Sequence, residues 1–169
     1  MKKIFAALAA LAITLTGCSA AAEENSGPAV VTANGYARAT DMMSEMNGML
    51  MTGVFMDITN NSGSDLTLIG GSTAIAERLE VHEVVAGVMR KKEGGLTIAA
   101  GQTQMLKPGG NHIMLVGLNG QLAAGTEVSL TLEFSNGDKV DVTVPVKVVN
   151  LEQEHYDSGS PSPSMEMGE

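Results

Sequence analysis

Two side chains that bind soft metal ions lie two residues apart in the run Gly109-Gly110-Asn111-His112-Ile113-Met114. The residues after the glycines are typical of a β-strand, and side chains at positions i and i+2 of a strand share one face, about 6.5 to 7 Å apart along it. His112 and Met114 can therefore lean toward one ion placed between them, provided that a neighbouring strand or loop completes the site. The segment that carries His82 and Met89 is the obvious supplier.

The chemistry of these four side chains favours one ion. Imidazole suits copper, zinc, iron or nickel, whereas a thioether adds affinity mainly for a soft ion, so two His and two Met select Cu(I). Taken alone, His82 is interpreted as an ordinary strand histidine. Met89 could equally be a core methionine, since Met commonly fills irregular apolar space. The hypothesis is that His82, Met89, His112 and Met114 bind Cu(I) together.

The first 17 residues have the layout of a secretory signal peptide, with Lys2 and Lys3 followed by an apolar run. The run is too short to remain as a membrane-spanning helix. It ends in Leu-Thr-Gly-Cys, which resembles the bacterial lipobox, so we expect Cys18 to be lipidated and to anchor the protein to a membrane. The protein is then an extracytoplasmic lipoprotein of the cell envelope or periplasmic face.

Cys18 is the only cysteine in the chain. Beyond the lipidated residue there is thus no thiol for a disulfide, a catalytic cysteine, a zinc-thiolate site or a blue-copper site. The net charge is −9, and loss of Lys2 and Lys3 with the signal peptide makes it more negative, which argues against nucleic-acid binding. No nucleophile is paired with a base in a recognisable motif, so we expect the protein not to be an enzyme.

The chain divides into four parts by composition. Residues 1–17 form the signal peptide, residues 18–29 a lipidated flexible spacer, residues 30–151 one folded domain, and residues 152–169 a disordered tail rich in Ser and Pro. Short β-rich runs separated by turn residues fill the domain, and the Asn136-Gly137 pair between two alternating runs is a strong hairpin signal. We therefore expect an all-β fold, an antiparallel barrel or sandwich. The predicted strands are residues 30–37, 50–59, 66–75, 79–85, 96–99, 102–106, 112–118, 127–134 and 139–149.

Four sequence blocks resemble a known family, the periplasmic copper(I) chaperones called PCuAC proteins. They are Tyr36-Ala37-Arg38-Ala39-Thr40, Glu80-Val81-His82-Glu83, Met89-Arg90 with Glu93-Gly94-Gly95, and the run from Leu106 to Leu115. The resemblance extends from about Gly35 to Val146. It implies a cupredoxin-like β-barrel and places the copper ligands of the family on His82, Met89, His112 and Met114.

One feature departs from the family pattern, because only the residues Glu83 to Val88 separate His82 from Met89. If this short hairpin does not carry the Met89 sulfur to the site, Met105 or a methionine of the 42–51 segment could replace it. That segment holds five of the 12 methionines, which either pack on the barrel or form a secondary Cu(I) site. Met42, Met46 and Met49 would share a face if one helical turn formed.

Secondary metal sites are therefore also expected, as alternatives to purely structural roles. The candidates are Met42, Met43, Met46, Met49 and Met51 for Cu(I), and in the tail His155, Met165 and Met167, with carboxylates beside them that suit Cu(II).

The resemblance implies a metallochaperone that holds Cu(I) and delivers it to a copper enzyme, such as the binuclear copper site of cytochrome c oxidase. The expected partners are the copper-accepting oxidase subunit or a thiol-containing copper assembly protein. Two alternatives stay open: a lipoprotein that sequesters copper for tolerance, and a β-domain lipoprotein that binds another solute without metal.

Overall fold

The computed structural model describes residues 28–40, 45–46 and 48–149, and every regular element among them is a β-strand. The strands are β1 (Val30–Arg38), β2 (Glu45–Met46), β3 (Met49–Asn60), β4 (Leu66–Ser72), β5 (Ala76–Val85), β6 (Val88–Lys91), β7 (Leu96–Ile98), β8 (Thr103–Leu106), β9 (His112–Leu118), β10 (Glu127–Phe134) and β11 (Lys139–Lys147). Among these residues no helix is long and apolar enough to cross a membrane. The predicted signal peptide, Cys18, the spacer up to residue 27 and the tail lie outside the described residues.

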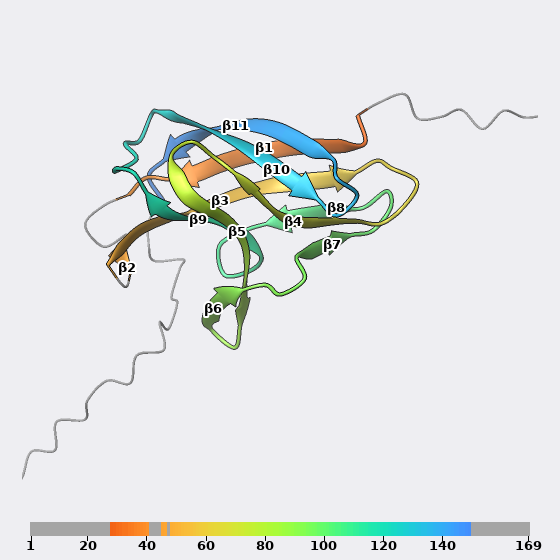
Figure 1. Ribbon diagram of the computed structural model, residues 1–169, viewed down its shortest axis with the longest axis horizontal. Helices are drawn as coiled ribbons and strands as arrows, with labels where there is room; N and C mark the ends of the chain where they lie inside the picture. The colour runs from red at the N-terminus through yellow and green to blue at the C-terminus, as the bar shows by residue number, and fades with distance from the viewer. Residues whose placement is uncertain (1–27, 41–44, 47, 150–169) are drawn as a thin grey trace, which may run out of the picture.

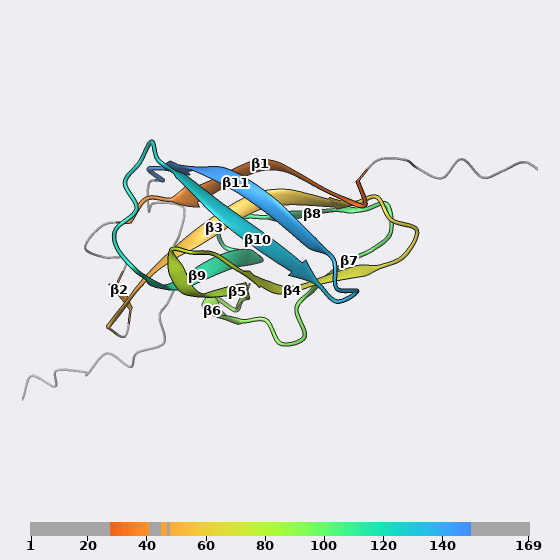
Figure 2. The same cartoon turned by 45° about the horizontal axis from the view of Figure 1, so that its top comes forward.

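Seven strands close into a barrel in the order β5-β9-β3-β1-β11-β10-β4, and β4 returns to β5 through the pair Gly71 and Leu79. Four short strands extend this barrel at its edges: β6 pairs with β5, β7 with β4, and β2 and β8 with β3. Figures 1 and 2 show β6 beside β5 at the lower side of the molecule and β2 at the end of β3. The predicted all-β barrel is confirmed.

One pairing departs from the predicted antiparallel arrangement. β1 and β11 are parallel, with Ala37 opposite Val146 and Arg38 opposite Lys147. Parallel strands need a long connection, and here the rest of the domain lies between the two strands. The first and last strands of the barrel thereby join side by side and seal it.

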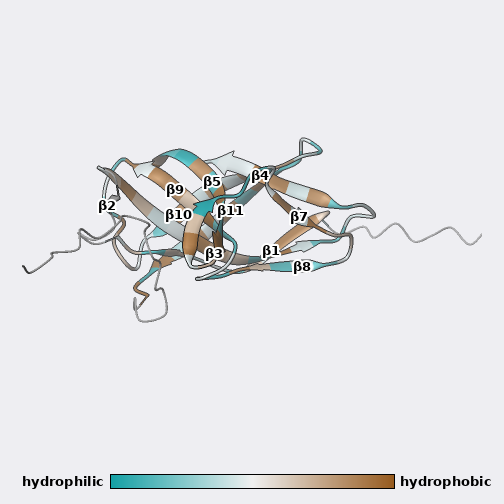
Figure 3. Ribbon diagram, turned by 90° about the horizontal axis from the view of Figure 1, so that it is seen from below, coloured by the Kyte–Doolittle hydropathy of each residue, from teal (hydrophilic) through white to brown (hydrophobic). Residues whose placement is uncertain are grey.

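The core forms because apolar residues alternate along the strands with residues that face outward, a pattern visible as alternating bands in Figure 3. On β10, Val128, Leu130 and Leu132 are buried in the core, and across the sheet Val144 on β11 is buried with them. The hairpin predicted from Asn136-Gly137 joins these two strands.

The observed strands match most of the predicted ranges and differ at a few ends. Residues 112–118 and 127–134 are confirmed as strands without change, whereas β4 stops at Ser72 and β5 begins earlier, at Ala76. β2 and β6 were not predicted. The 42–51 segment contains no helical turn over its described residues; instead Met46 pairs with Met49 across a β-hairpin.

Strand β9 is buried on both of its faces. Ile113 and Leu115 belong to the core cluster inside the barrel. His112, Met114 and Val116 alternate with them and are also buried, although they do not belong to that cluster. These three side chains therefore lie on the outer face of the barrel, beneath other side chains, and this covered outer face carries the candidate site.

Candidate metal centre

The two predicted histidine ligands lie opposite each other on adjacent strands. His82 on β5 is the cross-strand partner of His112 on β9, and their ring centroids are 5.8 Å apart. Leu79 and Val81 point into the core, so His82 faces outward with the face that carries His112. Strand alternation places both imidazoles on the outer face, and the register of β5 against β9 places them opposite each other.

The ring of His112 has a defined hydrogen-bonding state. Its Nδ1 atom donates a hydrogen bond to the carbonyl oxygen of Gly110 at 2.9 Å, so the lone pair of the neutral ring lies on Nε2. The side chain is only 1% exposed. Burial is the main cause that lowers the pKa of His112, and the charge of His82 acts in the same direction, against the opposing bond to Gly110. A neutral imidazole is the form that binds metal ions.

Met89 places its sulfur directly at His112. The distance from Met89 Sδ to His112 Nε2 is 3.3 Å. Both atoms present lone pairs, and a tetrahedral ion with bonds of about 2.0 Å to nitrogen and about 2.3 Å to sulfur would hold such a pair at about 3.5 Å. The observed distance between Met89 Sδ and His112 Nε2 is thus close to the distance expected between two atoms that bind the same ion.

The short hairpin after His82 accounts for this position. Val85 pairs with Val88, so the turn consists of Ala86 and Gly87, with φ angles of 52° and 81°. Two left-handed residues are typical of the tight turns whose twist matches a β-hairpin. Met89 pairs with Val84, which shares the outward face of His82. The short loop therefore places the Met89 sulfur beside His112.

Ion pairs hold this hairpin together on the face opposite to that of His82 and Met89. The carboxylate of Glu83 on β5 accepts hydrogen bonds from Arg90 at 2.9 to 3.0 Å and from Lys92 at 2.6 Å. The hydrogen bond from Lys92 is the largest cause that lowers the pKa of Glu83. Glu83 therefore stays ionised near neutral pH and holds β6 against β5.

His82 is held through one nitrogen and leaves the other without a partner. Its Nε2 atom donates to Glu80 Oε2 at 3.0 Å, because a carboxylate can only accept. The lone pair of the neutral ring then lies on Nδ1, which is buried and has no hydrogen-bond partner among the described residues. A buried polar atom without a partner costs free energy, so its presence fits an atom reserved for a ligand.

Glu80 is itself held by two cations, Arg78 at 3.3 Å and Lys91 at 3.7 Å. The hydrogen bond from His82 is the largest cause that lowers the pKa of Glu80. The carboxylate is therefore ionised and fixes the orientation of the His82 ring. Sequence reasoning missed this role, although alternation on β5 already places Glu80 and His82 on one face.

Met114 follows His112 on the same outer face, as predicted, and is 6% exposed. Its cross-strand neighbours are Glu80 on β5 and Gly53 on β3. Gly53 leaves room for the ring of Phe55, since a Cβ atom there would lie 2.8 Å from Phe55 Cζ. The structure thus seats Met114 beside the histidine pair, next to an aromatic side chain.

Phe55 forms one wall of the site together with Tyr36. The Phe55 ring centroid is 6.0 Å from that of His112 and 5.2 Å from that of Tyr36. Neither aromatic residue was predicted as part of the site. Gly53 offered a signal, because a glycine inside a strand often marks the close approach of another group.

The other predicted residues have varied positions. Met105 lies on β8 and is 57% exposed, with Asp57 as its cross-strand partner. Met49 and Met51 lie on β3, and Met46 lies on β2. Outside the described residues are Met42, Met43, His155, Met165 and Met167.

In the described part of the chain, no group of three or more His, Cys, Asp or Glu side chains is placed to hold a metal ion. The thioethers of Met89 and Met114 are the further donors on the outer face beside the two imidazoles, and thioethers favour a soft ion.

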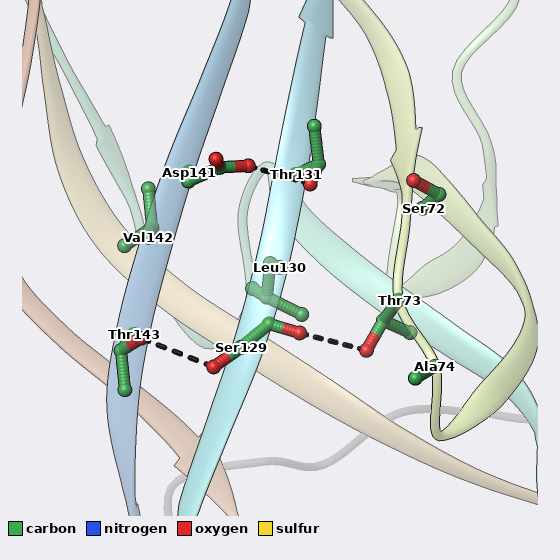
Figure 4. Close-up of a pocket in the computed structure, with 9 residues that line it drawn as sticks. All are labelled: Ser72, Thr73, Ala74, Ser129, Leu130, Thr131, Asp141, Val142 and Thr143. Atoms are coloured by element: carbon green, nitrogen blue, oxygen red, sulfur yellow. Dashed lines mark hydrogen bonds between the residues drawn. The ribbon is translucent and has the colours of Figure 1, made fainter.

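A separate pocket of about 490 Å³ lies over β4, β10 and β11 and is lined by none of the predicted ligands. Figure 4 shows hydrogen bonds among several of its lining groups: Thr131 donates to Asp141 at 2.6 Å, Ser129 bonds Thr143 at 3.1 Å, and Thr73 donates to the Ser129 carbonyl. These groups satisfy one another, so the pocket offers little unused hydrogen-bonding capacity.

The barrel, with its histidines and thioethers on the outer face, has the fold of PCuAC domains, as the resemblance implied. The copper-bound PCuAC domain from PmoF2 is similar with a TM-score of 0.59 and 19% identity, over 72% of this chain and 95% of that domain. The solution structure of CuI-DR1885 from Deinococcus radiodurans is similar with a TM-score of 0.60 and 27% identity, over 75% of this chain and 83% of that one.

The chain belongs to the family described as "Putative lipoprotein LpqE-like", whose model matches residues 30–146. A curated relative, the "Putative lipoprotein Lxx21020" of Leifsonia xyli subsp. xyli (strain CTCB07), is 35% identical over 153 residues, which cover 88% of this chain and 92% of the relative. The family's description as a lipoprotein accords with the anchor predicted from the lipobox.

Proposed function

We propose that this protein is an extracytoplasmic Cu(I) metallochaperone, anchored through a lipid on Cys18, that holds Cu(I) with His82, Met89, His112 and Met114. The observation that carries the proposal is the 3.3 Å contact between Met89 Sδ and His112 Nε2, next to a second histidine with a buried and unpartnered nitrogen. A relative at 27% identity was solved with Cu(I), which supports the choice of ion.

The ligand set suits reversible binding. Two neutral imidazoles and two thioethers add no charge to the ion and favour Cu(I) over Cu(II). Glu80 remains outside the set as the carboxylate that orients His82. Copper keeps its oxidation state throughout, so no oxidant or reductant is consumed when the ion arrives or leaves.

Release follows from the place of Met89 on the edge strand β6, which pairs only with β5 in the described sheet. An incoming thiolate or thioether replaces the Met89 sulfur first, because this ligand stands on a two-stranded hairpin rather than inside the barrel. The histidines and Met114 then follow by stepwise exchange. The proposed acceptor is a copper enzyme such as cytochrome c oxidase, at its binuclear copper site, or a thiol-containing copper assembly protein.

The ligand set is tested by copper K-edge X-ray absorption on the chain from residue 19 to residue 169, loaded without oxygen with one equivalent of Cu(I). We expect a mixed nitrogen and sulfur shell that loses sulfur in both Met89→Leu and Met114→Leu. Met105→Leu is the matched control, since it removes an exposed thioether from a neighbouring strand and should leave the shell unchanged. Failure of the wild-type chain to compete for Cu(I) with a chromophoric chelator would overturn the proposal.

Delivery is separated from sequestration by a transfer assay. The Cu(I)-loaded chain is mixed with a purified copper-accepting domain of the oxidase, and the copper content of each protein is measured after separation. Net movement of copper to the acceptor supports a chaperone. Retention by this chain with all acceptors tested, despite tight binding, would instead support a sequestration lipoprotein.

A further inference from the structure

A row of thioethers continues from the candidate site along the outer face of β3. Met51 on β3 is the cross-strand partner of Val116 on β9. Val116 lies on the same outer face as Met114, because the two are separated by one residue of a strand. Met51, and Met49 two residues before it, therefore share that face.

Met51 lies close enough to Met114 to share an ion with it. Gly53 is directly opposite Met114, so Met51 occupies the next position diagonally. Diagonal neighbours on one face of an antiparallel pair are about 7 to 8 Å apart, within reach of long side chains. Gly53 itself adds no side chain between the two thioethers.

These methionines do not serve the barrel core. The core cluster and the partly buried apolar side chains packed against it contain neither Met49 nor Met51. Thr52, between Gly53 and Met51, is buried and donates its hydroxyl hydrogen to the carbonyl of Arg38, which fixes the alternation of this part of β3. Both thioethers are only partly buried and thus accessible from solvent.

From this arrangement we infer that Met49 and Met51 form a second Cu(I) site, an entry position from which the ion passes to the His82 and His112 site by way of Met114. The inference rests on the proposed function. A site of thioethers alone selects a soft monovalent ion and lacks the stronger imidazole donors, so it binds more weakly than the principal site.

The transfer step is a ligand exchange. Copper held by Met49 and Met51 first gains the sulfur of Met114, then loses the bonds to Met49 and Met51 as bonds to the imidazole nitrogens form. The ion stays Cu(I), and no proton or electron is exchanged. Met114 is the ligand common to both positions.

The test uses the chain from residue 19 to residue 169, labelled with carbon-13 at its methionine methyl groups and titrated with Ag(I) as a redox-inert substitute for Cu(I). The first equivalent should shift the methyl signals of Met89 and Met114, and the second those of Met49 and Met51. Unmoved signals of Met89 and Met114 would defeat the proposed function. Normal first-equivalent shifts with unmoved Met49 and Met51 signals would defeat this inference alone.

A double variant, Met49→Leu with Met51→Leu, tests the entry role, and Met105→Leu is the matched control. We expect the double variant to keep the first equivalent with unchanged affinity, to lose the second, and to load Cu(I) from a chelator about tenfold more slowly. Loading at the wild-type rate would overturn the entry role. The wild-type titration decides on its own whether the second site exists. The inference can therefore be tested even if the double variant does not fold.

Discussion

Glu80 Oε2 lies 3.0 Å from His82 Nε2, and Glu80 is at the same time the cross-strand neighbour of Met114. The carboxylate thus contacts one proposed ligand and flanks another. Its side-chain partners lie on β5 and β6, and Met114 lies opposite it on β9. Carboxylates that orient a ligand histidine typically affect metal affinity as strongly as some ligands do.

Glu80→Leu should weaken Cu(I) binding about 10- to 100-fold, since the His82 ring loses the acceptor that fixes it. Glu80→Gln should weaken binding less, because its amide oxygen still accepts the hydrogen bond. Competition with a chromophoric Cu(I) chelator measures both. Glu77→Gln is the control, since Glu77 lies on the same strand and contacts Arg78 but no histidine. Wild-type affinity in Glu80→Leu would show that the hydrogen bond does not position the ring.

Gly53→Ala should disturb the site through Phe55. The new methyl group would lie 2.8 Å from Phe55 Cζ, so the Phe55 ring must move away from residue 53. This ring lies next to the His112 imidazole, so its movement also changes the environment of His112. We expect a loss of about 1 to 3 kcal/mol in the free energy of unfolding, measured by urea denaturation, together with weaker Cu(I) binding. Gly63→Ala is the control, because a Cβ atom added there would meet no atom within 4 Å. It should change neither the free energy of unfolding nor Cu(I) binding.

Ala86→Asn should stabilise the hairpin that carries Met89. Ala86 has a φ of 52°, a conformation that disfavours an ordinary side chain and that Asn tolerates better. Asn followed by Gly87 is also the preferred pair for this turn. The free energy of unfolding should rise by about 0.5 to 1 kcal/mol. Gly87→Ala, at a φ of 81°, should lower it, and equal effects of the two changes would contradict the turn assignment.

The stability of the copper-free protein should depend on pH through His112. Burial lowers the pKa of this imidazole below its usual value of 6.5. The unfolded chain therefore takes up a proton at a higher pH than the folded one, so the stabilisation is complete above pH 6.5 and is lost as the pH falls through the lower folded pKa. Histidine proton NMR should give a midpoint below 6.5 for His112. A midpoint at or above that value would contradict the buried, neutral ring.

Much of the fold was predictable because its signals are local. Alternation of apolar and polar residues predicted the strand at 127–134, a short β-rich run predicted the strand at 112–118, and the Asn136-Gly137 pair predicted the hairpin between β10 and β11. The parallel pair of β1 and β11 was not predictable in this way. It depends on where the barrel closes, a property of the whole chain that no single segment encodes.

The site was predictable to the extent that it follows from strand faces. The two histidines face each other because their strands pair in the one register that aligns them. The placement of Met89 was left open, since it depends on the φ angles of Ala86 and Gly87 rather than on loop length alone. Phe55 was missed because its role arises from a contact between strands, whereas Glu80 could have been found from its place two residues before His82 on one strand. The metal ligation of the four residues stays a prediction.

The direction of β1 has a consequence for a tethered protein. Val30, where the barrel begins, pairs with Asn60, whereas Tyr36 pairs with Phe55 beside His112, about 20 Å farther along the strand. In the proposed anchored form, the chain that follows Cys18 enters the barrel at the pole remote from the histidines. The proposed copper site therefore lies at the opposite pole of the domain from the point of attachment.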